Sequence, residues 1–204
     1  MESPDPQAHG PEDPTRSRAR TPLGDRDREI LRAIARESIE HGLSASRPLP
    51  VAVGCFPPVL RAPGATFVTL ETQGELRGCI GSLEPRRPLV EDVAENAFAA
   101  AFRDPRFPPL GTAEWPEVTF HISHLTPSEP LPADTREELL NALRPGVDGL
   151  LLEDPPYRST FLPQVWESLP EPEEFLGELC RKAGLDRDHW SPTVRFRRYE
   201  VSEF

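Results

Sequence analysis

Lysine is almost absent from this chain of 204 residues. Lys182 is the only one, and the other basic residues among the 23 are arginines. Asp and Glu together number 34, which gives a formal net charge of −11 at pH 7. This acidic balance argues against a protein that binds nucleic acid by neutralising its phosphates. We therefore do not expect nucleic acid as a partner.

Cysteine is also scarce, and its three positions are widely separated. Cys55, Cys79 and Cys180 form no CxxC pair and no zinc-ligand pattern, so we expect no metal site. A small odd number of cysteines suits a reducing cytosol better than a disulfide scaffold. No apolar run approaches the ~18 residues that indicate a transmembrane helix, and the N-terminus lacks the apolar stretch of a secretory signal. These absences predict a soluble, cytoplasmic protein without membrane contacts.

Nucleotide and metalloprotease signatures are missing as well. The chain has no Walker loop, no G-x-G-x-x-G after a strand and no H-E-x-x-H. We expect no cofactor.

Proline, by contrast, is abundant, with 26 residues. Residues 1–24 contain five prolines and no large apolar residue between Met1 and Leu23. Such a segment buries too little apolar surface to offset the entropy of ordering it. The sequence therefore predicts a disordered, proline-rich tail over residues 1–24 and a folded region over residues 25–204.

Helical periodicity appears in four segments of the folded region. The first is predicted to begin with a cap at Asp25 or Asp27 and to end at Gly42. Another follows Pro88 and stops before Asp104-Pro105. A third starts at a capping-box-like pair, Asp134 and Glu137. The fourth is the segment PEEFLGELCRKAG, with Gly184 as its stop.

Strand patterns are interleaved irregularly with these helices. The segment TFVTLETQGELRGCI predicts a β-hairpin with Gln73-Gly74 as its turn. Further strands are predicted for VTFHISHL, for the pair GLLLE and YRSTFL, and for TVRFRRYEV. This order favours an α+β fold, with a mainly antiparallel β-sheet flanked by helices, over a doubly wound parallel sheet.

The thiol with the most distinctive surroundings is Cys79, in Leu76-Arg77-Gly78-Cys79-Ile80-Gly81. Glycines on both sides permit close backbone approach and leave the thiol accessible at the end of a strand. Arg77 would favour the thiolate, the form that acts as nucleophile or metal ligand. The alternative is that Cys79 is a small hydrophobic residue of the core.

A second polar group, Arg103-Asp104-Pro105-Arg106-Phe107, follows the alanine-rich helix directly. Its guanidinium groups would suit a carboxylate or phosphate. The alternative is a structural role, in which the segment is a proline-stiffened loop at the end of the helix. Asp104 then pairs with Arg106, and Phe107 anchors the loop.

Two histidines occupy the VTFHISHL segment. His121 and His124 are three positions apart, so in a strand they point to opposite faces and do not bind one metal together. His124 is the better candidate for a general base near neutral pH, although a core histidine is the simpler interpretation.

The sole lysine lies in LCRKAG, near the end of a predicted helix. A lysine ammonium has a tunable pKa, which suits roles that arginine does not fill. Its position is equally explained by the favourable helix dipole at a C-terminus.

Three segments together resemble the AMMECR domain family, in the bacterial branch called AmmeMemoRadiSam system protein A. They are the stretch GATFVTLETQGELRGCIGSLEPRRPLVEDVAENAFAAAFRDPRFPPL, the block STFLPQVWE and the block EEFLGELCRKAGL. The resemblance covers residues 25–204. It implies an α+β domain with a larger and a smaller subdomain, and we expect residues 82–115 to form part of the smaller one.

The resemblance also implies candidate site residues and partners. The family's characteristic positions fall here on Arg77, Gly78, Cys79, Gly81, Asp104, Arg106, Phe107, Thr160, Gln164 and Lys182. Of these, Gly78, Gly81 and Phe107 are expected to be structural, and Cys79 is the candidate catalytic residue. The implied partners are a Memo-like protein and a radical S-adenosylmethionine enzyme. The resemblance brings no established biochemical activity or oligomeric state with it.

Two hypotheses for function follow. In the first, the chain is an accessory or substrate-binding component that acts with these two partners. In the second, it is an enzyme that uses Cys79 as nucleophile or thiolate ligand, with Arg77 and Arg106 orienting a small anionic substrate.

Overall fold

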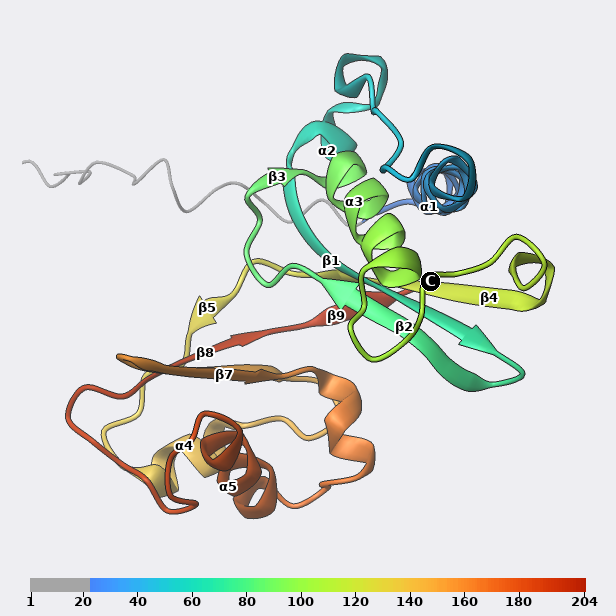
Figure 1. Ribbon diagram of the computed structural model, residues 1–204. Helices are drawn as coiled ribbons and strands as arrows, with labels where there is room; N and C mark the ends of the chain where they lie inside the picture. The colour runs from blue at the N-terminus through green and yellow to red at the C-terminus, as the bar shows by residue number, and fades with distance from the viewer. Residues whose placement is uncertain (1–22) are drawn as a thin grey trace, which may run out of the picture.

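The structure, a computed structural model, describes residues 23–204. These residues form two antiparallel sheets, each with helices packed on one face (Figure 1). The predicted tail lies outside the described residues except for its last two. Leu23 is buried in the core, and Gly24 is the N-cap of the first helix. Both residues therefore belong to the fold, although the sequence pattern places them in the tail.

The α+β fold with antiparallel sheets is confirmed. The α-helices are α1 (Asp25–Ala45), α2 (Pro58–Arg61), α3 (Leu89–Phe102), α4 (Arg136–Ala142) and α5 (Pro172–Lys182). Short 3-10 helices cover Val53–Cys55, Trp115–Glu117 and Pro163–Glu167. The strands are β1 (Pro63–Thr72), β2 (Glu75–Gly81), β3 (Arg87–Pro88), β4 (Val118–Leu125), β5 (Glu129–Pro130), β6 (Gly149–Asp154), β7 (Tyr157–Phe161), β8 (Arg195–Tyr199) and β9 (Val201–Glu203).

The larger unit is a five-stranded sheet with α1 and α3 on one face (Figure 1). Its strands run in the order β2-β1-β4-β9, and β3 pairs with one end of β1. The buried side of α3 carries small and branched apolar residues, and these let the helix lie close to the sheet. Fully buried members of this core include Leu31, Ile39, Val68, Val93 and Ala97.

The β1–β2 hairpin has the predicted turn. Gln73 and Gly74 both have positive φ, 56° and 79°, as a type I′ turn requires. The register then shifts, because Leu70 pairs with Gly78 whereas Glu71 pairs with Leu76. Arg77 is therefore the extra residue of a β-bulge, a feature that redirects a side chain at a sheet edge.

The smaller unit is a four-stranded sheet in the order β5-β8-β6-β7, with α4 and α5 on one face. Leu150 and Leu152 of β6 are fully buried toward these helices. The Phe175 ring of α5 stacks on Trp166, with ring centroids 3.7 Å apart. Aromatic and leucine side chains thus form a second, separate core.

Residues 82–115 do not belong to that second core. Their helix, α3, packs on β1 and α1 in the larger unit. The smaller core is built from residues between Leu131 and Phe196. The expected assignment of residues 82–115 to the smaller subdomain is corrected by this packing, since the alanine-rich face of α3 fits the larger sheet.

Several local predictions differ from the structure. Helix α1 is capped by Gly24 rather than Asp25 or Asp27, and it continues to Ala45 instead of ending at Gly42. The N-cap of α4 is Thr135, whose hydroxyl accepts a hydrogen bond from the Glu138 backbone, and Glu138 in turn accepts from the Asp134 backbone. The residues that cap α4 are therefore Thr135 and Glu138 rather than Asp134 and Glu137. The last predicted strand divides at Glu200 into β8 and β9, which belong to different sheets.

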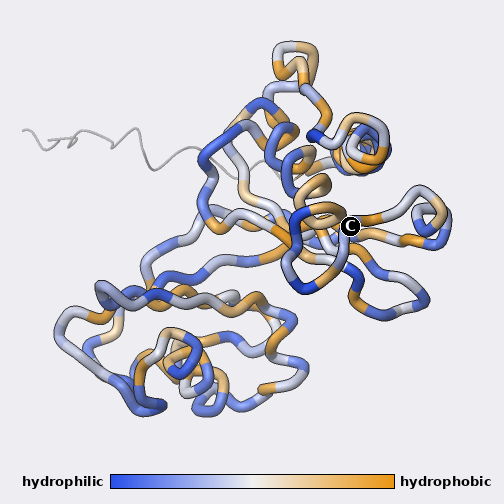
Figure 2. The backbone as a smooth tube through the Cα atoms, in the orientation of Figure 1, coloured by the Kyte–Doolittle hydropathy of each residue, from blue (hydrophilic) through white to orange (hydrophobic). Residues whose placement is uncertain are grey.

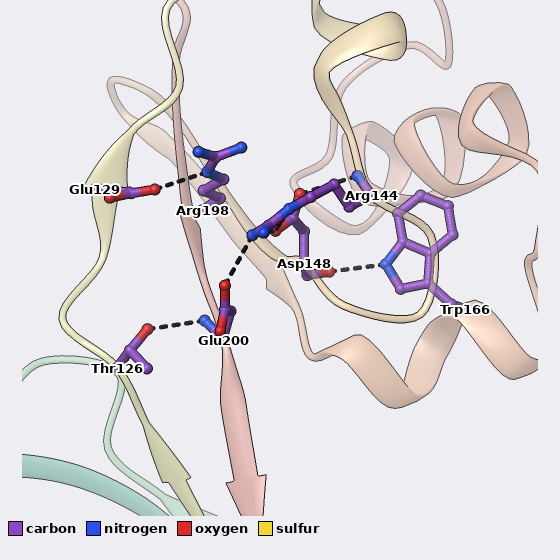
Figure 3. Close-up of polar contacts among 7 residues, drawn as sticks. All are labelled: Thr126, Glu129, Arg144, Asp148, Trp166, Arg198 and Glu200. Carbon is purple, nitrogen blue, oxygen red and sulfur yellow. Dashed lines mark hydrogen bonds and ion pairs between the residues drawn. The ribbon is translucent and has the colours of Figure 1, made fainter. Parts of the chain in front are cut away.

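The chain passes between the two units twice, once from β4 to β5 and once from β8 to β9. Figure 3 shows the polar network at this crossing. The Arg144 guanidinium pairs with the fully buried carboxylate of Asp148 and, at 3.0 Å, with Glu200. The Glu200 backbone N–H donates to Thr126, and the Asp148 carbonyl accepts from the Trp166 indole at 2.8 Å. These contacts tie the crossing strands to the core of the smaller unit.

Hydrophobic and hydrophilic segments alternate along the backbone of both units (Figure 2). Within residues 23–204, no helix combines the length and the apolar character that crossing a membrane requires.

Gly78 offers a test of the contact between α3 and β2. A Cβ atom at Gly78 would lie closer than 3.0 Å to the Ala100 carbonyl oxygen, and backbone on both sides leaves little room for relief. We expect Gly78→Ala to lower the free energy of unfolding by about 1–3 kcal/mol, as overpacking does. The measurement is urea unfolding. Gly54→Ala is the control, because its Cβ would meet nothing within 4 Å, and an unchanged G78A midpoint would contradict the described packing.

Candidate functional site

Cys79 lies on β2, the edge strand of the larger sheet, and its backbone is held by the loop after α3. The Cys79 N–H donates to the Asp104 carboxylate at 2.8 Å. Its carbonyl accepts from the Arg106 guanidinium at 3.4 Å. The Asp104–Arg106 pair therefore takes the place of a neighbouring strand at this residue, which protects an otherwise open sheet edge.

Asp104 and Arg106 also bind each other. Two guanidinium nitrogens of Arg106 donate to the two carboxylate oxygens of Asp104 at 3.0 and 2.7 Å. The Asp104 side chain is only 2% exposed. The hydrogen bonds from Arg106 hold the pKa of Asp104 far below its ordinary value, so the carboxylate stays charged and the loop stays closed on β2.

The bulge directs Arg77 to the same loop. Its guanidinium forms a bidentate pair with Glu114 and donates to the Pro108 carbonyl at 2.9 Å. The Phe107 ring lies near two guanidinium groups, 5.7 Å from Arg77 and 5.5 Å from Arg106. Glu114 was not predicted from the sequence, and no local pattern marks it, because it lies 37 residues beyond Arg77.

Both motif glycines lie where a Cβ atom would clash. Gly78 lets α3 approach, and a Cβ atom at Gly81 would clash with the Phe67 ring. The structure thus brings Arg77, Gly78, Cys79, Asp104, Arg106 and Phe107 together around one edge of the larger sheet.

The Cys79 thiol points away from α3 and accepts a hydrogen bond from the Thr69 hydroxyl at 3.3 Å. Thr69 pairs with Cys79 on one side and with His121 on the other. His121 therefore lies on the thiol's face of the sheet, about 10 Å away across two strand spacings.

His124 is on the opposite face, paired with the buried Thr66, and burial lowers its pKa. The expectation that the two histidines face apart is confirmed. The preference for His124 as a general base is corrected, because the sheet separates it from the thiol.

The remaining predicted residues lie in the smaller unit. The Thr160 hydroxyl donates to the Leu150 carbonyl at 2.9 Å and lies 2.8 Å from the Tyr199 hydroxyl. The Lys182 ammonium donates to the Thr160 carbonyl at 2.9 Å and lies 5.0 Å from the centre of the Phe161 ring. Desolvation there lowers the pKa of Lys182.

Gln164 has a different environment. Its amide donates to Glu203 of β9 at 3.0 Å, which links the smaller unit to the larger sheet. The candidate residues therefore form two groups, one in each unit, and of them only Gly81 and Thr160 border the groove between the units.

A groove lies between the two units. One cavity of about 290 Å³ is enclosed by the β2–β3 loop and the outer face of the smaller sheet. A second, of about 330 Å³, continues along that loop and includes Gly81. We call them together the inter-sheet groove, lined by Gly81, Ser82, Leu83, Glu84, Arg86, Arg87, Ser128, Leu151, Glu153, Arg158, Thr160, Arg197 and Tyr199.

A serine, a histidine and an aspartate also meet at the end of β6. The Asp154 carboxylate accepts from Ser191 and binds His189 Nε2, each at 2.7 Å, and accepts from Thr193 at 2.6 Å. A catalytic triad requires the histidine between the serine and the aspartate. Here the aspartate is the shared partner, so the cluster fixes the 189–193 loop rather than activating the serine.

The fold and these contacts define an α+β protein of two antiparallel sheets with a groove between them. The family model described as AMMECR1 matches residues 32–204, and the chain belongs to that family.

Relatives span nearly the whole chain. A protein of Methanothermobacter thermautotrophicus is 40% identical over 189 residues, covering 90% of this chain and 96% of its own. One from Methanocaldococcus jannaschii is 38% identical over 178 residues, covering 83% of this chain and 85% of its own. The crystal structure of the uncharacterised protein PH0010 from Pyrococcus horikoshii is similar with a TM-score of 0.76 and 35% identity, covering 86% of this chain and 89% of that one.

The Asp154 cluster predicts a specific pH dependence. Hydrogen bonds from Thr193, His189 and Ser191 lower the pKa of Asp154 to about 2. A carboxyl whose pKa is lowered by folding stabilises the fold above its ordinary pKa, and this stabilisation is lost as the pH falls through the folded value. We expect Asp154→Asn to be less stable than the wild type at pH 6, with the difference shrinking between pH 4 and pH 2.

Thermal unfolding across this pH range measures the effect. Asp188→Asn, at an exposed position in the same loop region, is the control and should show no such convergence. A constant difference between D154N and wild type at every pH would show that charge at Asp154 does not matter.

Proposed function

We propose that this chain is an accessory or substrate-binding component that acts with a Memo-like protein and a radical S-adenosylmethionine enzyme. The observation that carries the proposal is how the motif side chains are used. Asp104 and Arg106 bind each other and the Cys79 backbone, and Arg77 binds Glu114. The charged groups of the motif thus build a rigid edge, which suits recognition by another molecule.

An exposed apolar side chain lies at this edge. Leu76 precedes Arg77 in β2 and is 45% exposed, although most large apolar residues of the unit are buried. An exposed leucine beside fixed arginines and aromatic rings has the composition of a protein contact, with an apolar anchor and a polar rim. We place the partner contact on the hairpin end of β2.

Co-purification tests this proposal. The full chain carries the tag, and each partner is expressed with it in turn. We expect at least one partner to be retained by the wild type and lost, by about tenfold or more, from Leu76→Glu, since a central apolar contact is replaced by a charge. Val147→Glu is the matched control, because Val147 is 44% exposed but lies in the smaller unit. Absence of a complex with either folded partner would contradict the proposal.

The second candidate is an enzyme that uses Cys79 as nucleophile or thiolate ligand on a small anionic substrate. One contact favours it. The Thr69 hydroxyl donates to the Cys79 sulfur at 3.3 Å, which fixes the position of the sulfur, as a nucleophile requires.

Alkylation rates separate the two candidates. Cys55 is exposed, and Cys180 is buried in an environment that raises its pKa. If Cys79 serves the structure, iodoacetamide at pH 7 modifies Cys55 fastest and Cys180 slowest, with the half-buried Cys79 between them. Faster modification of Cys79 than of Cys55 would favour the enzyme. If Cys79→Ser acts with the two partners as well as the wild type does, covalent chemistry at Cys79 is excluded.

A further inference from the structure

The outer face of the smaller sheet carries an unusual row of cationic side chains. The helices cover the face that contains Leu150 and Leu152, so the alternate residues of each strand face the larger unit. The register places Leu151 beside Thr160 on one strand and beside Arg197 on the other. Two residues further along β6, Glu153 lies between Arg158 of β7 and Arg195 of β8. Arginines from two strands therefore face the inter-sheet groove.

Arg197 differs from the other arginines of the groove. Its guanidinium donates to the hydroxyl and to the carbonyl of Ser128, at 2.9 and 2.6 Å. Both acceptors are neutral, and within residues 23–204 Arg197 makes no ion pair. Arg158, in contrast, pairs with Glu84 at 2.7 Å and with Glu153 at 3.3 Å. Arg197 is thus fixed in direction while its charge is uncompensated.

The arginines of the opposite wall are paired with carboxylates. Arg86 pairs with Glu84, which Arg158 already binds, and Arg87 pairs with the buried Asp92 behind the loop. The groove is lined by four arginines and only two glutamates. With Asp92 behind the loop counted, one positive charge remains in excess, opposite in sign to the charge of the whole chain, −11. Clustered charge between low-dielectric walls attracts ions of the opposite sign.

The floor of the groove is neutral and already satisfied. The Thr160 hydroxyl donates to Leu150, and the Tyr199 hydroxyl donates to the Phe161 carbonyl at 3.1 Å. Burial raises the pKa of Tyr199 to about 12, so the phenol carries no charge near pH 7. The Tyr199 ring lies over Gly149, where a Cβ atom would clash with it. An anion entering the groove would meet no negative charge on this floor.

We propose that the inter-sheet groove binds a small molecule through an oxyanion, a carboxylate or a phosphate, with Arg197 as its main contact and Arg158 beside it. A guanidinium held in a fixed direction presents its remaining N–H groups to two oxygens of such a group. The cavities, of about 290 and 330 Å³, suit a small ligand. This site requires neither Cys79 nor a protein partner.

Calorimetric titration of the full chain with inorganic phosphate and with succinate, at constant ionic strength, tests the site. We expect saturable binding of at least one of them, weakened by about tenfold or more in Arg197→Met, since one charge-assisted contact is lost. Arg195→Met is the matched control. Arg195 is on the same strand and face, but its guanidinium binds the carbonyls of Pro192 and Val194 and does not line the groove.

Retained binding in R195M together with lost binding in R197M would support the proposal. Whichever of phosphate and succinate binds more tightly shows whether the groove recognises a phosphate or a carboxylate. Equal weakening in both variants would show general charge attraction and overturn it. Absence of saturation below ~10 mM in the wild type would also overturn it.

A measurement on the wild type covers the case in which R197M does not fold. The Nε–H signal of Arg197, observed by nitrogen-15 NMR, should shift on titration with the bound probe, and the Arg195 signal should not. An unshifted Arg197 signal would overturn the proposal. Because partners are absent from both experiments, their outcome is independent of the co-purification result.

Discussion

The close approach of α3 to β2 is the constraint on which the larger unit depends. Gly78 permits it, because any side chain there would meet the Ala100 carbonyl. The end of α3 then lies beside the sheet edge, and the loop that follows places Asp104 and Arg106 against the Cys79 backbone. Without that approach, the two segments of the family motif would have no contact. The absence of a side chain at Gly78 thus allows Asp104 and Arg106 to reach the Cys79 backbone.

The relation between the two units has a similarly local cause. Two strand connections join them, and the pair Arg144–Asp148 holds one connection through Glu200 (Figure 3). Gln164 adds a second tie through Glu203. These contacts keep the outer face of the smaller sheet near the β2–β3 loop. The inter-sheet groove exists because no helix covers the outer face of the smaller sheet, so side chains of that sheet and of the β2–β3 loop line the space between the units.

The partner proposal and the oxyanion proposal concern different surfaces. The rigid edge carries Leu76 and the motif side chains on the larger unit. The inter-sheet groove is lined mainly by the smaller sheet and one loop. A binding component can use both, with a partner at the edge and a small molecule in the groove. Gly81 borders the groove on the strand that holds Cys79, so the two surfaces are neighbours.

Much of the fold is predictable from the sequence, because its determinants are local. Alternating β-branched residues around Gln73-Gly74 specify the hairpin, and the apolar periodicity after Pro88 specifies α3. The cap of α4 was misplaced by one residue, since Asp134 and Thr135 are both good caps and only the backbone distinguishes them. The resemblance points to ten positions, of which Cys79, Asp104 and Arg106 are in contact, whereas Thr160 and Lys182 contact each other in the smaller unit.

By itself, then, the sequence determined most of the longer helices and strands, the antiparallel α+β class and the family, which depend on neighbours along the chain. Only the tertiary structure decided which side chains meet. Arg77 pairs with Glu114, which lies 37 residues further along the chain. The strand register places His121, and not His124, on the same face of the sheet as the Cys79 thiol. The uncompensated charge of Arg197 likewise appears only when three strands and a distant loop come together. Long-range pairing sets these contacts, and no local pattern of residues encodes it.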